Sequence, residues 1–375
     1  MRKPVKKGII IAFGELFLKS EGVRKLFAER LVRNLYFFLK KGGAHFKIHF
    51  FRERIFIETN QTIKAKKIIK KVFGIAWFAE NFWFSDINQL IHFVGGNYPD
   101  WIKKNETFAI RVKKDRKIID KIAKNINRKV DLTKPDKELF IENRNNNWFL
   151  YFKKIKGASG LPLGSSGKVL TLMSGGIDSP VAAFFTAKRG AENIWLHFHS
   201  FPLVSNASIE KVKELAKVFL EYQPHLKIYF IPFQKAQMEI KAKTPAKYRI
   251  LLYRRLMFKI AQKIAEKENC QALVTGESLG QVSSQTLPNI KIIEEIVKIP
   301  VLRPLIGFDK EEIIKLAKKM GTFEISIKPQ EDCCTLFVSK HQTAQGDLKK
   351  AKELEKKINT SRIIKEALRG VDWQF

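Results

Sequence analysis

Hydrophobic residues in the N-terminal part of the chain follow strand and helix patterns in turn. An apolar run over residues 7–13 has the length of a buried strand, and residues 24–39 carry apolar side chains at helical spacing. Further elements are predicted as two short strands within 46–59, a basic helix from 62 to about 71, a strand over 107–112, a lysine-rich helix over 118–127, and strands over 138–142 and 148–153. This order predicts two small α+β domains, over residues 1–61 and 62–165.

A segment rich in glycine, serine and proline, residues 157–167, predicts a turn-rich connection before the pattern changes. The later elements are predicted as strands over 169–173, 193–199, 227–232 and 272–275, with helices over 179–188, 209–219 and 247–267 between them. Strands that alternate with helices indicate parallel βαβ units, so residues 166–375 are predicted to form a doubly wound α/β domain. Residues 347–357 are predicted to form a charged helix with a solvated face.

The strand at 169–173 leads directly into the sequence SGGIDS, residues Ser174 to Ser179, and Pro180 follows in the first turn of the predicted helix. Paired glycines let the backbone approach an anion, and the helix N-terminus supplies unpaired N–H groups. The segment is neither a Walker A sequence nor a dinucleotide GxGxxG. A plain glycine turn is the alternative, but the flanking strand and helix together with Asp178 favour a phosphate-binding loop.

The overall charge points to a polyanionic partner. The chain of 375 residues has 70 lysines and arginines against 37 acidic residues, a formal net charge of +33. Such an excess attracts nucleic acid, although a lysine-rich solvated surface is the alternative and charge does not separate RNA from DNA.

Cysteine usage and hydropathy exclude several classes of protein. Three cysteines (Cys270, Cys333 and Cys334) are too few for a disulfide scaffold and lack zinc-site spacing, so no structural metal is expected. No apolar run approaches the roughly 20 residues of a membrane span. Glu15 and Lys19 interrupt the N-terminal apolar stretch, which is therefore read as a buried strand rather than a signal peptide, in a cytoplasmic protein without a membrane partner.

The SGGIDS sequence resembles the PP-loop of the ATP pyrophosphatases, which adenylate a substrate and release pyrophosphate. Three further segments, 272–286, 302–311 and 330–334, together with this loop resemble the ThiI family of tRNA 4-thiouridine synthetases. The resemblance continues N-terminally, because residues 13–19 are similar to the GE-x-x-LK signature of the family's ferredoxin-like domain and 62–165 to its RNA-binding THUMP domain.

The resemblance implies a ferredoxin-like domain, a THUMP domain and a PP-loop domain that uses ATP and Mg²⁺. It implies an ATP site formed by Met173, Ser174, Gly175, Gly176, Ile177, Asp178, Ser179, His199, Gly276 and Gln285. Asp178 is expected to be catalytic, and Lys310 or Arg303 to stabilise charge on the phosphates. One departure concerns nucleotide contacts, since the segment after His199 lacks the Glu-Arg pair that the family often has.

Sulfur chemistry is expected at the cysteine pair. Cys333 aligns with the family's catalytic cysteine and would carry a persulfide, with Cys334 as the fallback. An iron–sulfur cluster on the three cysteines is a less favoured alternative, because adjacent ligands suit it poorly, and Cys270 is predicted to be a buried core thiol. No rhodanese domain is recognised, so a cysteine desulfurase is expected to supply sulfur directly to Cys333.

The family resemblance also implies the RNA partner. The basic N-terminal half is expected to hold the tRNA acceptor arm by phosphate and shape, with Lys113, Lys114 and Arg116 as candidate contacts. The uridine at position eight is the expected target, and a homodimer is the expected assembly. The aromatic run 77–84 is predicted to be core or interface rather than a stacking platform. Rival functions are another adenylating enzyme on the same domain and an RNA-binding module with a decayed site.

Overall fold

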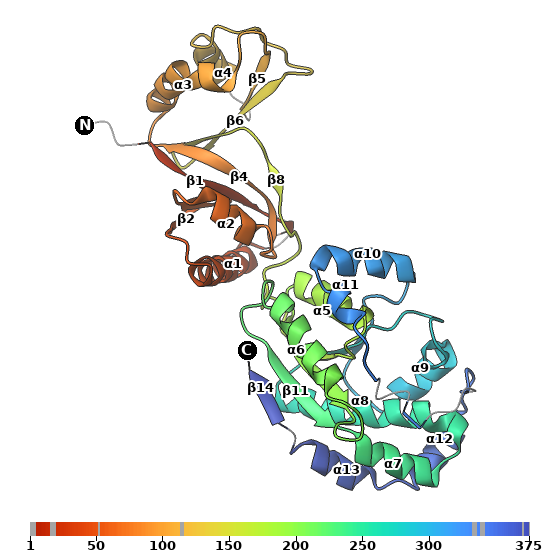
Figure 1. Cartoon of the computed structure of the whole chain (residues 1–375). Helices are drawn as coiled ribbons and strands as arrows, with labels where there is room; N and C mark the ends of the chain where they lie inside the picture. The colour runs from red at the N-terminus through yellow and green to blue at the C-terminus, as the bar shows by residue number, and fades with distance from the viewer. Residues whose placement is uncertain are drawn as a thin grey trace. The chain divides into compact units, whose positions relative to one another are not determined.

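The computed structural model describes residues 5–15, 20–51, 53–112, 116–331, 336–337, 342–369 and 371–374. The chain divides into two compact units, Met1–Pro162 and Leu163–Phe375, and each unit has its own sheet and core (Figure 1). Within the described ranges, no helix combines the length and the apolar composition that a membrane crossing requires.

The first unit is built on one eight-stranded sheet. Its strands are β1 (Lys6–Phe13), β2 (Lys47–Phe51), β3 (Arg54–Glu58), β4 (Ile75–Phe84), β5 (Phe108–Val112), β6 (Lys137–Arg144), β7 (Asn147–Tyr151) and β8 (Ile155–Lys156). They lie in the order β2-β3-β1-β4-β7-β6-β5, with β8 paired to β4. The helices are α1 (Glu21–Lys41), α2 (Thr62–Ile69), α3 (Ile87–Trp101) and α4 (Arg116–Ala123).

Strand β1 shows how the apolar run specifies this sheet. Because side chains alternate between the two faces of a strand, Ile9 and Ile11 pack against α1 and α2, whereas Ile10 joins an aromatic cluster on the opposite face. Helices α3 and α4 pack against β5, β6 and β7 in a separate core. Strand β4 buries Phe78 and Phe84, which confirms that the aromatic run contributes to the core.

The second unit contains a six-stranded sheet. Its strands are β9 (Lys168–Leu172), β10 (Glu192–His199), β11 (Lys227–Pro232), β12 (Ala272–Val274), β13 (Val301–Leu302) and β14 (Val371–Gln374). Its α-helices are α5 (Asp178–Lys188), α6 (Ala207–Phe219), α7 (Gln234–Lys243), α8 (Arg249–Lys267), α9 (Leu287–Glu294), α10 (Lys310–Met320), α11 (Phe323–Ser326), α12 (Leu348–Glu355) and α13 (Thr360–Ala367). The strand order is β13-β12-β9-β10-β11-β14.

Helices cover both faces of this sheet, as predicted for a doubly wound domain. Helices α5 and α10 pack on one face of the sheet, and α8 packs on the other. Strands β9 to β13 are parallel, but β14 pairs antiparallel with β11, which the sequence did not predict. The chain leaves β9 toward β10 on one side and returns to β12 on the other. Such a reversal creates a crevice at the carboxyl ends of the strands.

Helix α12 lies within the predicted charged segment and has one buried face beside its solvated face. It buries Ala351 and Leu354, and Glu355 accepts a hydrogen bond at 2.9 Å from Arg255, whose side chain is 1% exposed. One face of the helix therefore packs on α8, and only the remaining face is solvated.

Candidate active site

The phosphate loop lies between β9 and α5, at the carboxyl edge of the sheet. Its backbone adopts a left-handed conformation at Gly175, with φ of +85°, which favours glycine. The Ser174 amide donates to Ser179 Oγ at 3.2 Å, and the Gly176 amide donates to Ser174 Oγ at 3.2 Å. The two hydroxyl groups thus brace the loop ahead of the first turn of α5, where backbone N–H groups are available to an anion.

Asp178 lies in the first turn of α5 and has two partners from distant segments. Lys310 Nζ lies 2.6 Å from Oδ1 of Asp178, and Gln281 Nε2 donates to Oδ2 at 3.1 Å. Lys310 is the first residue of α10, a helix whose capping box is formed by Asp309 and Glu312. The capped start of α10 therefore places a half-exposed cation beside the phosphate loop.

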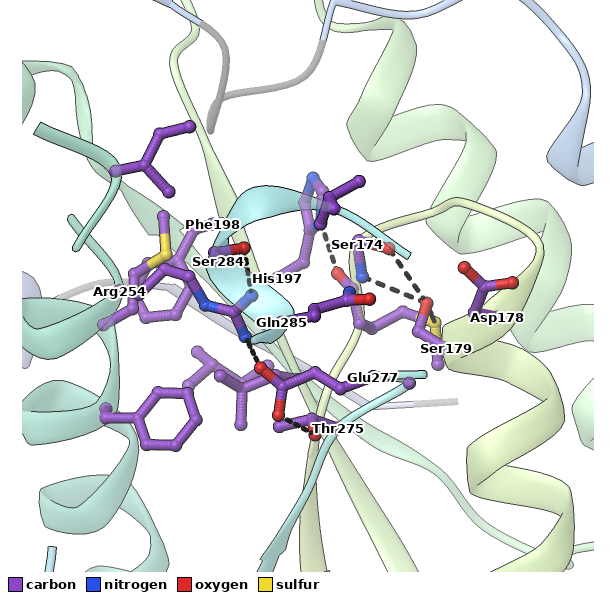
Figure 2. Close-up of a pocket in the computed structure, with 18 of the residues that line it drawn as sticks. Ser174, Asp178, Ser179, His197, Phe198, Arg254, Thr275, Glu277, Ser284 and Gln285 are labelled. Carbon is purple, nitrogen blue, oxygen red and sulfur yellow. Dashed lines mark hydrogen bonds and ion pairs between the residues drawn. The ribbon is translucent and has the colours of Figure 1, made fainter. Parts of the chain in front are cut away.

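A cavity of about 360 Å³ opens beside the loop. Its walls come from the ends of β9, β10 and β12, from α8, and from residues 282–285. Polar groups of the phosphate loop line one side, and the side chains of Phe198, Met257 and Phe258 add apolar surface. Figure 2 shows Ser174 and Asp178 at one end of the cavity and Arg254 at the other. A cavity of this size, with apolar surface on one part and polar groups on another, suits a small organic ligand.

A buried carboxylate holds Arg254 at this cavity. The side chain of Glu277 is 3% exposed and pairs with Arg254, whose Nη1 also donates to Ser284 Oγ at 3.1 Å (Figure 2). Glu277 Oε2 accepts from Arg303 Nε at 2.7 Å and from Thr275 Oγ1 at 2.9 Å. Burial alone would raise the pKa of Glu277, but the two guanidinium groups and the Thr275 hydroxyl outweigh it, so the pKa is lowered. Glu277 therefore stays ionised and orients both arginines.

His197 supports the loop from β10 as a neutral ring. Its Nδ1 lies 2.8 Å from the Met173 carbonyl oxygen, which can only accept, so Nδ1 carries the proton. The other nitrogen, Nε2, accepts from Ser208 Oγ at 3.1 Å. Burial lowers the pKa of His197 to about 4. The ring therefore buttresses the loop and does not serve as an acid or base near neutral pH.

This pKa predicts a pH dependence of stability. Between about pH 6.5 and pH 4, the unfolded chain binds a proton at His197 that the folded chain does not, so stability falls as the pH falls. The contribution is roughly 3 kcal/mol over this window. In urea unfolding at pH 7 and pH 4.5, His197→Asn should lose less stability on acidification than wild type, whereas the exposed control His225→Asn should match wild type. Equal losses in His197→Asn and wild type would contradict the assignment.

Gly276 allows β12 to approach the start of α5. A Cβ at this position would lie 2.7 Å from the Ser179 amide nitrogen and 2.8 Å from the Asp178 carbonyl carbon. Gly276→Ala should therefore displace the loop and cost about 1–3 kcal/mol of stability. Thermal unfolding measures this effect. At Gly307 an added Cβ meets nothing within 4 Å, so Gly307→Ala is the matched control, and equal effects in both variants would contradict the steric argument.

The structure brings together many of the residues predicted from the sequence. Those that line the cavity are Met173, Ser174, Asp178, Ser179, Gly276 and Gln285. Gly175, Gly176 and Ile177 complete the loop, and Lys310 reaches it through Asp178.

Other predicted residues lie elsewhere. Arg303 and His199 are outside the residues that line the cavity: Arg303 pairs with Glu277 and Glu294, and His199 is a buried residue at the end of β10. Arg116 is exposed at the start of α4. Lys113, Lys114, Cys333 and Cys334 lie outside the described residues. Cys270 is buried, as predicted for a core thiol.

Sequence reasoning did not select Arg254, Glu277, Gln281 or His197. Glu277 and Gln281 lie in the segment 272–286, which supported the family resemblance, but neither residue was predicted to have a specific role. Arg254 belongs to the long helix α8, where the adjacent Arg254-Arg255 pair within an apolar stretch was the available signal.

The parallel sheet, the glycine loop at the start of α5 and the adjoining cavity define the class of PP-loop ATP pyrophosphatase domains. Comparison with known proteins then identifies the family. The family model for the thiamine biosynthesis protein (ThiI) matches residues 164–360, and the ThiI ferredoxin-like domain matches residues 8–79. The chain belongs to the ThiI family of tRNA sulfurtransferases.

Individual relatives are similar in sequence to this chain over nearly the full length of both proteins. A protein of Caldanaerobacter subterraneus subsp. tengcongensis named "Probable tRNA sulfurtransferase" is 40% identical over 373 residues, covering 96% of this chain and 97% of its own. A protein of Bacillus licheniformis with the same name is 36% identical, covering 97% of this chain and 94% of its own. A crystal structure of a 4-thiouridine synthetase–RNA complex with bound ATP matches with a TM-score of 0.88 and 32% identity, covering 99% of this chain and all of that one.

Proposed function

We propose that this chain adenylates a uridine of tRNA, at position eight, and replaces its 4-oxygen with sulfur to give 4-thiouridine. The observation that carries the proposal is the glycine loop at the start of α5, where Asp178 lines a cavity of about 360 Å³ and pairs with Lys310. The full-length similarity to a 4-thiouridine synthetase whose complex contains RNA and ATP supports the same reaction.

The chain's own residues provide binding and charge stabilisation for the adenylation step. The loop amides and the hydroxyl groups of Ser174 and Ser179 would hold the phosphates of ATP. The uridine 4-oxygen attacks the α-phosphorus and pyrophosphate leaves, which converts a poor leaving oxygen into an AMP ester. Lys310 at the loop and Arg254 across the cavity are the cations placed to stabilise the developing charge.

Magnesium fits this site as a companion of the nucleotide. Mg²⁺ is commonly held by one or two carboxylates together with substrate phosphates, and Asp178 offers one carboxylate at the loop. Among the described residues no group of three His, Cys, Asp or Glu side chains could hold a metal ion alone. When bound, the ion would neutralise phosphate charge.

Sulfur delivery is assigned to the cysteine pair. Cys333 would receive a persulfide sulfur from a cysteine desulfurase, with Cys334 as the alternative carrier. The outer sulfur attacks C4 and AMP leaves with the former 4-oxygen. A free thiol, such as the cysteine supplied to the desulfurase, then attacks the Cys333 sulfur and cleaves the S–S bond, which leaves sulfur on C4 and forms a mixed disulfide between that thiol and Cys333.

The remaining parts of the proposal concern partners. Residues 62–165, with Lys113, Lys114 and Arg116 as candidate contacts, would hold the tRNA acceptor arm. We further propose a cytoplasmic homodimer, on the basis of the family resemblance. Light scattering of the purified protein tests the dimer.

Two unmodified tRNA transcripts test the target position. The protein is incubated with MgATP, a cysteine desulfurase and cysteine, and with a tRNA that carries either uridine or cytidine at position eight. The uridine transcript should give pyrophosphate and 4-thiouridine, and the cytidine transcript neither. Thiolation of both transcripts would contradict position eight. Tight binding of both without pyrophosphate release would indicate an RNA-binding protein instead.

A further inference from the structure

Residues 326–331 lead to the phosphate loop, and contacts with α6 hold the first part of this segment. Lys211 of α6 is 4% exposed, and its ammonium donates to the carbonyl oxygens of Ser326, at 3.1 Å, and of Lys328. Lys328 in turn pairs with Glu214 of α6 at 2.5 Å. Burying an ammonium is costly unless its hydrogen bonds are satisfied. Because the buried ammonium of Lys211 donates to two main-chain carbonyl oxygens, it holds residues 326–328 against α6.

The end of the same segment contacts the phosphate loop itself. Gln330 Nε2 donates to the Ser174 carbonyl oxygen at 3.2 Å, and a Cβ at Gly175 would lie 2.9 Å from Gln330 Oε1. The next residue, Glu331, accepts from the Ser205 amide at 3.1 Å. Gln330 thus lies directly against the loop that the proposed function assigns to the phosphates of ATP.

Chain connectivity joins this contact to the cysteine pair. Cys333 follows Gln330 by three residues, and three residues of extended chain span at most about 11 Å. The contact with Ser174 therefore limits how far the sulfur carrier can be from the adenylation site.

We infer that Gln330 is a positioning residue that ties the cysteine-bearing segment to the phosphate loop and so couples adenylation of the uridine to sulfur transfer. This inference rests on the proposed function. An adenylated uridine whose sulfur does not arrive is open to attack by water at C4, which returns uridine and AMP and wastes the ATP. Misplacement of a reacting group by about 1 Å can cost about 100-fold in rate. Loss of the contact between Gln330 and Ser174 should therefore slow sulfur transfer, so that hydrolysis of the adenylated uridine competes with it.

The test measures two products of one reaction, pyrophosphate released and 4-thiouridine formed, under single-turnover conditions with full-length protein, unmodified tRNA, MgATP, cysteine desulfurase and cysteine. Gln330→Leu removes the amide at similar volume, and Gln330→Glu keeps the shape but removes the N–H donor. Both should lower the ratio of 4-thiouridine to pyrophosphate by about 10- to 100-fold. Gln262→Leu, at a glutamine of α8 that bonds Glu266, is the matched control and should keep the wild-type ratio.

The outcomes separate the inference from the proposed function. A lower ratio in both Gln330 variants, with AMP and uridine making up the difference, supports the coupling role. An unchanged ratio in Gln330→Glu, whether or not both products fall together, overturns it, because the residue would then act only on loop structure or ATP binding. Wild-type protein that releases no pyrophosphate with unmodified tRNA contradicts the proposed function itself, and the inference with it.

Discussion

Replacing Asp178 with asparagine is expected to lower the rate of tRNA-dependent pyrophosphate release by about 100- to 1,000-fold. The substitution keeps the shape of the side chain but removes the charge that pairs with Lys310 at 2.6 Å. It also places an amide N–H₂ where a carboxylate would face a cation bound with the phosphates. The partner Lys310 is half-exposed and stays solvated when it loses this pair, so the loss should appear in activity rather than in folding.

Asp309→Asn provides the matched control for this prediction. Asp309 precedes Lys310 and caps α10 by accepting from the Glu312 amide at 2.8 Å. Asparagine caps helices about as well as aspartate, so pyrophosphate release should stay within about twofold of wild type. A comparable loss in both variants, or a fully active Asp178→Asn, would contradict the assignment of Asp178.

Cys333→Ser is expected to lower 4-thiouridine formation with cysteine desulfurase and cysteine by at least about 100-fold, because a hydroxyl cannot carry a persulfide. Pyrophosphate release should continue, since adenylation precedes sulfur transfer. Free sulfide should restore part of the product, as it needs no carrier. Mass spectrometry of digested tRNA measures the nucleoside in each case.

Two further cysteine variants complete this experiment. Cys334→Ser should retain thiolation, and loss there instead of at Cys333 would exchange the two roles. Burial raises the pKa of Cys270 to about 12, so its thiol stays protonated and unreactive. Cys270→Ala should therefore thiolate like wild type. Loss of product in Cys270→Ala that remains folded would favour joint action of the three cysteines, as in a cluster.

Local patterns predicted much of the fold because the elements concerned have regular periodicity. The apolar run at β1 and the SGGIDS loop are examples in which sequence neighbours determine the structure. Helix α3 was missed because Gly95, Gly96 and Pro99 interrupt its pattern. The signal that could have identified it is Asp86, which caps the helix by accepting from the Gln89 amide at 2.8 Å. Strand β14 has four residues, and only its pairing with β11 defines it.

In the candidate site as well, some residues could be predicted from their sequence neighbours and others could not. The loop residues are adjacent in sequence, so their joint role follows from the motif. Arg254 and Glu277 are 23 positions apart and meet only because α8 packs over β12. The adjacent Arg254-Arg255 pair in an apolar helix marks an unusual position, but it does not indicate which carboxylate either arginine meets. His197 and His199 share one face of β10, and the sequence alone does not tell which of them reaches the loop.

The most direct measurement follows the uridine oxygen. Transcripts labelled with ¹⁸O at the 4-position of uridine eight are thiolated with MgATP, cysteine desulfurase and cysteine, and the AMP released is analysed by mass spectrometry. Because the 4-oxygen attacks the α-phosphorus and leaves with AMP, one ¹⁸O atom should appear in AMP for each 4-thiouridine formed. AMP without the label, accompanied by 4-thiouridine, would contradict adenylation of the base.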